Sequence, residues 1–249
     1  MKIKIPKKAA KLILLAKNIL AKDMADGVNS VLDHLDMAAM SIITGIADVK
    51  HNMFLQKSRD AEKATENRDI ALGEYNNSIQ RGTVRFYVTS IRDILLGIYK
   101  GNERQLGDWS FEVNADMTVV IPKNAAELIL LAKNILAKHA TDGASSPLNS
   151  LNMADMMDKY TIAAAQHTLS KTLERESEEA AQDRNLALGH GKNQNSYTPN
   201  TVLFFVCSVR DGLLSVFRGR ERHLGEWGFN VDASAPSVTP VTDIRVTTD

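Results

Sequence analysis

The sequence predicts an all-α protein, built as a tandem duplication of a three-helix unit with one long helix in each copy. The run LILLAKNILAK at residues 12–22 returns letter for letter at residues 128–138, a shift of 116 positions. A repeat of this kind decides the architecture before any other pattern is considered. A second observation supports the helical class, because residues 153–188 contain neither proline nor glycine. A helix of that length is expected to span about 54 Å at 1.5 Å per residue.

The duplication also sets the domain boundaries. A closing motif, Leu-Gly-x-Trp-x-Phe-x-Val, begins at Leu106 and returns at Leu224. We therefore expect a first repeat at residues 1–116, a second at 117–232 and a Ser/Thr/Pro-rich C-terminal tail at 233–249. The sequence leaves open whether the repeats form one body or two domains. It also leaves open whether the tail is a linker or the start of a truncated further domain.

The first helix of each repeat is expected to begin at Pro6 or Pro122. Proline suits the first helical turn, because the N–H group it lacks would have no partner there. The same helices are expected to end near Gly27 and Gly143, since glycine accepts the left-handed conformation that follows a helix. Apolar residues between these limits cover more than one stripe, which predicts a helix near the centre of the fold.

The long second helix carries Gly45 in the first repeat. One helical glycine costs about 1 kcal/mol relative to alanine, so we expect it to bend the helix without ending it. The first half of each long helix is rich in alanine and methionine, and the second half is mostly charged. This composition predicts one narrow packed edge and a wide solvated face.

The third helix is expected at about 83–99 and 201–217, where apolar residues alternate steps of four and three. Thr83 and Thr201 are its expected N-caps. Period-two patterns flank the helices, as in Trp109-x-Phe111-x-Val113, and predict short extended segments. The first and third helices would pack on opposite halves of the long one. The two repeats would then form an elongated bundle about a pseudo-two-fold axis.

Composition narrows the expected partners and location. Lysine plus arginine and aspartate plus glutamate each number 30, so no global charge favours nucleic acid or an anionic membrane. Cys207 is the sole cysteine, which excludes an internal disulfide and cysteine-based zinc sites, and we expect it buried. No stretch is long enough to span a membrane, and the apolar run near the start recurs internally, so a cytoplasmic location is expected.

Two histidines are the candidate ligand or metal residues. His51 and His167 occupy equivalent positions midway along the two long helices. If those helices cross, the imidazoles could form a metal or anion site between the repeats. We favour structural histidines instead, each bonded within its own unit. Asp48 lies one turn before His51, but Ala164 stands at the equivalent place in the second repeat.

Further residues retained in both repeats are interpreted as structural anchors. They are Arg92, Asp93, Arg210 and Asp211, expected to form ion pairs between helices, and the aromatic residues Trp109, Phe111, Trp227 and Phe229. The alternative for the charged residues is an anionic ligand or acid–base chemistry. The alternative for the aromatic residues is stacking on a sugar or a base, although we expect each tryptophan in the core of its own repeat.

No catalytic motif accompanies these residues. The Gly-x-Ser-x-Gly elbow, the His-Glu-x-x-His helix and the dinucleotide-binding fingerprint are all missing from the sequence. We therefore expect no cofactor and a non-enzymatic helical scaffold or protein-interaction protein. Its partners would be other proteins or copies of itself as a homo-oligomer. The alternative is a small-ligand or metal-binding bundle with a site near His51 and His167.

Overall fold

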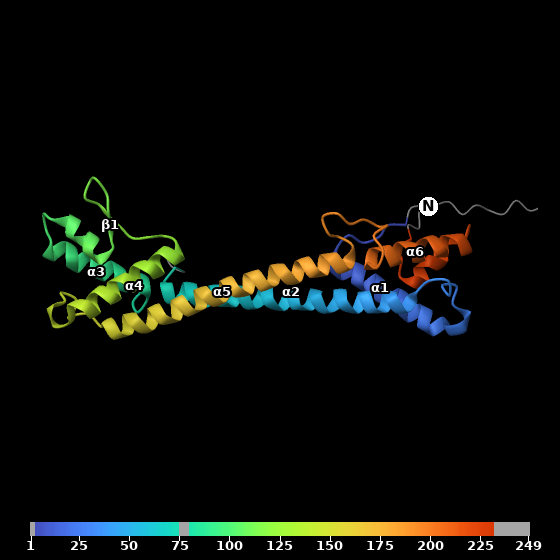
Figure 1. Ribbon diagram of the computed structural model, residues 1–249, viewed down its shortest axis with the longest axis horizontal. Helices are drawn as coiled ribbons and strands as arrows, with labels where there is room; N and C mark the ends of the chain where they lie inside the picture. Colours follow the sequence, from blue (N-terminus) through green and yellow to red (C-terminus); the bar gives the residue numbers. More distant parts are fainter. Residues whose placement is uncertain (1–2, 75–79, 232–249) are drawn as a thin grey trace, which may run out of the picture. The chain divides into compact units, whose positions relative to one another are not determined.

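The protein is described by a computed structural model that covers residues 3–74 and 80–231. Helices hold 71% of it and strands 3%, which confirms the all-α prediction. The predicted tail at 233–249 lies outside the described residues. The α-helices of the described part are α1 (Ala9–Asp26), α2 (Met37–Leu72), α3 (Val84–Ile98), α4 (Ala125–Asp142), α5 (Met153–Leu188) and α6 (Val202–Val216) (Figure 1).

The two repeats give helices of matching length. α1 and α4 have 18 residues each, α2 and α5 have 36, and α3 and α6 have 15. Thr83 caps α3 as expected, since its hydroxyl accepts a hydrogen bond from the Phe86 N–H group, and Thr201 caps α6 in the same way. The predicted starts at Pro6 and Pro122 were three residues too early. In α4 the capping residue is Asn124, whose side chain accepts a hydrogen bond from Ala126 N at 2.8 Å.

The chain divides into two compact units that do not coincide with the sequence repeats. The terminal unit comprises residues 1–55 and 178–249, and the central unit comprises residues 56–177. Both boundaries fall inside a long helix, so each unit contains one part of α2 and one part of α5. The terminal unit adds α1 and α6, whereas the central unit adds α3 and α4.

In the terminal unit α1 packs against α6 and against the short 3-10 helix η4 (Glu221–Trp227). Its core draws on both ends of the sequence, with Leu12 and Ile19 from α1 beside Val209 and Leu213 from α6. The central unit repeats this arrangement with α4, α3 and the 3-10 helix η2 (Glu103–Trp109). Each unit therefore pairs the first helix of one repeat with the third helix of the other.

Each unit contains one antiparallel pairing of short extended segments, and the two pairings join equivalent positions of the repeats. In the central unit β1 (Glu112–Val113) and β2 (Val119–Val120) form an antiparallel pair in which Glu112 faces Val120. In the terminal unit Lys4 forms an antiparallel bridge with Asn230. Lys4 and Asn230 are the repeat equivalents of Val120 and Glu112. The pairing made by a tight connection in one unit is thus made by distant segments in the other.

Candidate functional site

The two tryptophans are buried, and each packs against the first helix of the other repeat. Trp109 and Trp227 are 1% and 2% exposed. The Lys138 ammonium lies 5.4 Å from the centre of the Trp109 ring, and the Lys22 ammonium lies 5.5 Å from that of Trp227. We expected each tryptophan in the core of its own repeat. The 3-10 helix that carries it does pack against the third helix of that repeat, but the first helix of the other repeat contributes to the same core. With Phe111 also buried, the rings leave no face for a sugar or base.

A retained aspartate orients each of these lysines. Lys22 bonds to Asp26 at 2.5 Å, and Lys138 bonds to Asp142 at 2.6 Å, one helical turn later in each case. The hydrogen bond that Lys138 donates to Asp142 raises the pKa of Lys138. The ammonium stays charged near neutral pH, where it is attracted to the negative face of the indole ring. The residues therefore stabilise the contact between repeats and are not free for chemistry.

The retained Arg–Asp pairs lie within single helices. Arg92 and Asp93 approach to 2.7 Å on α3, as do Arg210 and Asp211 on α6. We expected ion pairs between helices, whereas these partners are neighbours in the chain and their carboxylates are exposed. Exposed pairs of this kind contribute little to stability, typically under 1 kcal/mol.

Cys207 on α6 is buried, as expected, and burial raises the pKa of its thiol.

The candidate histidines fall in different units. His51 is on α2 in the terminal unit and His167 is on α5 in the central unit. Within the described residues the Nδ1 atom of each is buried without a hydrogen-bond partner. Burial lowers the pKa of both imidazoles, with a further lowering by Arg184 at His51 and by Arg68 at His167. Both are therefore neutral at pH 7.

The surroundings of the histidines differ between the units. Asp48, one turn before His51, pairs with Lys17 of α1 at 2.7 Å. Arg184 lies 4.6 Å from the centre of the Phe54 ring and donates to the amide oxygen of Asn185 at 3.0 Å. In the described part of the chain no group of three or more His, Cys, Asp or Glu side chains could hold a metal ion.

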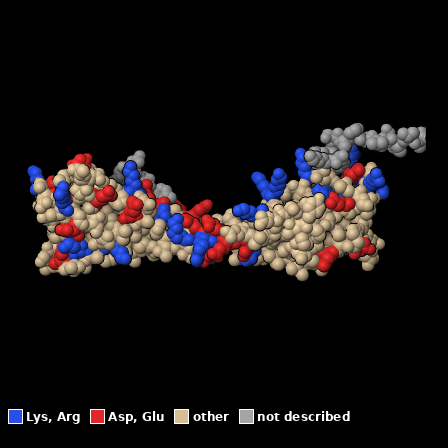
Figure 2. Space-filling model, turned by 45° about the horizontal axis from the view of Figure 1, so that its top comes forward, with Lys and Arg blue, Asp and Glu red and all other residues tan. Residues whose placement is uncertain are grey.

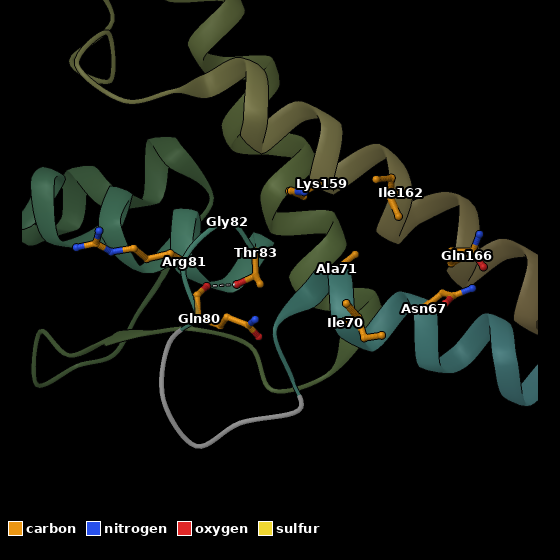
Figure 3. A pocket seen from close by; sticks show the side chains of 10 residues that line it. All are labelled: Asn67, Ile70, Ala71, Gln80, Arg81, Gly82, Thr83, Lys159, Ile162 and Gln166. Carbon is orange, nitrogen blue, oxygen red and sulfur yellow. Dashed lines mark hydrogen bonds between the residues drawn. The ribbon is translucent and has the colours of Figure 1, made fainter.

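A cavity of about 470 Å³ opens between α2 and α5 in the central unit (Figure 3). The Asn67 and Gln166 side chains lie close together at one end, and Arg81 extends away from the other labelled side chains. In the terminal unit the equivalent positions hold Asp183 and Lys50, whose charged groups are 2.6 Å apart. Sequence reasoning missed this cavity, because amide side chains on a long helix usually indicate only a solvated face.

The first half of α2 presents an exposed apolar face, which we call the α2 face. Ile42, Ile46, Val49 and Met53 are 66%, 45%, 58% and 44% exposed and follow steps of four, three and four. Every exposed residue between positions 38 and 53 is uncharged: Ala38, Ser41, Ile42, Gly45, Ile46, Val49, Asn52 and Met53. The sequence predicted a wide solvated face on the long helices, and in this part of α2 the exposed face is largely apolar.

Charged side chains gather instead on the part of α2 and α5 that belongs to the central unit, and Figure 2 shows acidic and basic groups close together on the surface. There Lys57 and Glu176 form an ion pair at 2.5 Å, and the Ser58 and Ser177 hydroxyls bond at 2.8 Å. These contacts hold α2 to α5 within the central unit.

The spacing of Ile42, Ile46 and the following apolar residues was the available sequence signal for the α2 face. This spacing did not identify the α2 face, because the buried face of the same helix, which includes Met40, has the same spacing of apolar residues.

Comparison with protein-family models, with curated proteins and with solved structures gives no match to this chain. None of the helices in the described residues is long and apolar enough to cross a bilayer.

Proposed function

We propose that this protein is a non-enzymatic helical scaffold that binds other protein chains, including copies of itself, through exposed helix faces. The observation that carries the proposal is the uncharged α2 face. Contiguous exposed apolar residues on a folded protein mark interaction sites, whereas single exposed ones are ordinary. Four such residues at coiled-coil spacing on one helix fit a partner that is itself helical.

The contacts made by the residues retained in both repeats support a scaffold over an enzyme. The retained tryptophans, lysines and Arg–Asp pairs are engaged in packing or in local ion pairs. An acid, base or nucleophile would need a perturbed pKa in a concave site with a second group within hydrogen-bond reach. The lowered pKa values of His51 and His167 are not accompanied by such a partner among the described residues.

We also propose that the chain arose by tandem duplication of a three-helix repeat. Matching helix lengths, the Lys22 and Lys138 contacts, and the shared register of the extended segments support it. The pseudo-two-fold relation between the repeats stays a prediction. Duplication matters for function, because a face needed for assembly can be kept in one repeat and lost in the other.

The expected self-association is weak. Burying one whole Ile, Val or Met side chain contributes about 1.5–3 kcal/mol, and the four side chains of the α2 face are roughly half exposed. Two such faces would contribute on the order of 6–12 kcal/mol before the association cost of about 4–15 kcal/mol is subtracted. The gain and the cost are of similar size, so a dimer formed through these faces is weak and its population depends on concentration.

Sedimentation equilibrium tests the proposal directly. Over about 1 µM to 1 mM, a range that covers binding free energies of about −8 to −4 kcal/mol, the mean mass should rise above that of one chain. A strict monomer over this range at both low and high salt would contradict self-association. High salt should not weaken the association, since the α2 face carries no charge.

A second candidate function is a small ligand or metal at the histidines. It is favoured by the buried, unpartnered Nδ1 atoms of His51 and His167. A buried acceptor without a donor is costly, and a ligand or ion could satisfy it. Elemental analysis and native mass spectrometry of purified protein test this candidate. Stoichiometric zinc or copper that disappears in a His51→Ala/His167→Ala variant would promote it above the scaffold.

A further inference from the structure

We propose that the α2 face pairs with the α2 face of a second copy across a two-fold axis, with Gly45 at the point of closest approach. This rests on the proposed self-association and names the surface and the partner. The contact is a helix pair, in which Ile42 and Ile46 of each chain fill the space beside the small residues of the other.

The α2 face offers both halves of such a contact. A ridge of large apolar side chains runs along it from Ile42 to Met53. A row of small residues lies directly beside the ridge, formed by Ala38, Ser41 and Gly45. Two-fold contacts require a surface that is complementary to itself, because the same residues must serve on both sides. A ridge next to a shallow row meets this requirement, since each ridge can enter the other chain's row.

Packing within the described residues does not require a glycine at position 45. Gly45 lies inside α2, it is not among the residues with positive φ, and a Cβ atom built there would meet nothing within 4 Å. Glycine in a helix is unfavourable relative to alanine, so the fold alone would favour a larger residue. Close approach of a second helix backbone explains the glycine, as small residues do at other tightly packed helix pairs.

The second repeat shows which features of the face are specific. Its equivalents of Ile42, Gly45 and Val49 are Asp158, Thr161 and Ala165, on a helix of the same length. A charge at the equivalent of Ile42 and a branched side chain at the equivalent of Gly45 would oppose helix pairing there. The α2 face is therefore not repeated on α5, and two-fold pairing through it closes as a dimer.

Charge favours a second copy over a charged partner. The exposed residues from Ala38 to Met53 carry no ionisable group that could select an acidic or basic peptide. The chain's formal net charge is zero, so two copies approach without long-range repulsion. An uncharged amphipathic helix from another protein is the competing occupant, and it is one outcome of the test.

The test uses the full-length chain and substitutions taken from its own second repeat. Ile42→Asp and Gly45→Thr place on α2 the residues that α5 carries at the same positions. We expect each to weaken dimerisation at least tenfold in sedimentation equilibrium while leaving the helical circular dichroism unchanged. The matched control is Ile162→Asp, which puts the same charge on a similarly exposed isoleucine in the central unit, and it should dimerise like the wild type.

The variant Gly45→Ala distinguishes an effect on the dimer contact from an effect on the stability of the helix. Alanine is a better helix former, so at low concentration amide hydrogen exchange in the first half of α2 should slow. If Gly45 is the point of closest approach, the same variant should dimerise more weakly than the wild type. Higher stability with weaker association supports the contact, whereas unchanged or tighter dimerisation overturns the role of Gly45.

The outcomes keep the two proposals apart. Wild-type dimers that persist in Ile42→Asp and Gly45→Thr overturn the α2 pairing and leave self-association standing. A wild type that is monomeric over the whole range overturns both. A monomeric wild type that binds an uncharged amphipathic helical peptide, with binding lost in Ile42→Asp, replaces the second copy by a different partner and keeps the scaffold.

Discussion

Replacement of Trp227 by alanine should loosen the first helix of the chain, although that helix lies some 200 positions earlier in the sequence. Trp227 is buried in the terminal unit, where η4 packs against α1. If tryptophan burial removes about 150–250 Å² from water, a coefficient of about 25 cal/mol/Å² gives 4–6 kcal/mol. Measured aromatic-to-alanine losses of about 3–5 kcal/mol agree, so we expect the terminal unit to lose about 4 kcal/mol.

Hydrogen exchange with mass spectrometry is the suitable assay, because an overall unfolding midpoint would mix two units. Trp227→Ala should speed exchange in α1 and α6 and leave α3 and α4 near their wild-type rates. Trp109→Ala should do the reverse. Faster exchange in α4 and not in α1 after Trp227→Ala would refute the crossed packing, since it would place the tryptophan in the core of its own repeat. A loss below about 1 kcal/mol in the terminal unit would refute the burial argument.

Three further predictions concern single groups. Tyr87 on α3 donates a hydrogen bond to Asp155 on α5, and this bond raises the pKa of Tyr87 to about 12. Tyr87→Phe should therefore cost the central unit about 1–3 kcal/mol of stability. In a tyrosinate absorbance titration the same variant should lose the step near pH 12. The stabilisation that accompanies this pKa shift is complete below about pH 10 and is lost as pH rises through 12, which denaturation at high pH should show. The lowered pKa values of His51 and His167 favour the neutral form in the fold, so their contribution to stability should be complete above pH 6.5 and fall as acid protonates them. Urea melts of His51→Gln/His167→Gln should show a weaker acid dependence than the wild type, and the part that remains includes His190, whose pKa burial also lowers. If these histidines are structural, metal content by elemental analysis should be no lower in His51→Ala/His167→Ala than in the wild type.

Local features of the fold were predictable because they depend on a few neighbouring residues. Thr83 and Thr201 cap their helices, and both tryptophans are buried. The helix starts near Pro6 were misplaced because proline is tolerated before a helix as well as in its first turn. Partner choice was harder, because the two copies of LILLAKNILAK offer the same apolar surface to either third helix.

The candidate surfaces were less predictable than the fold. A seam with apolar spacing was visible around Ile46, but spacing alone does not say which of two apolar sides of α2 is buried. That choice depends on where α1 and α6 pack, which is a tertiary property. The reason to examine Gly45 likewise appears only when the space around it is known, because a helical glycine in a sequence can equally mark a bend.

The matched register of the Lys4–Asn230 bridge and the Glu112–Val120 pair has a consequence for chain connectivity. The hairpin connection at residues 114–118 joins two strands that the terminal unit brings together without a direct link. The two units therefore pair equivalent segments and differ in whether a short connection joins those segments directly. A circular permutant opened between residues 114 and 118, with a flexible linker joining Lys4 to Asn230, would keep every helix and exchange the roles of the two units. Such a permutant would test whether connectivity at this edge is separable from packing.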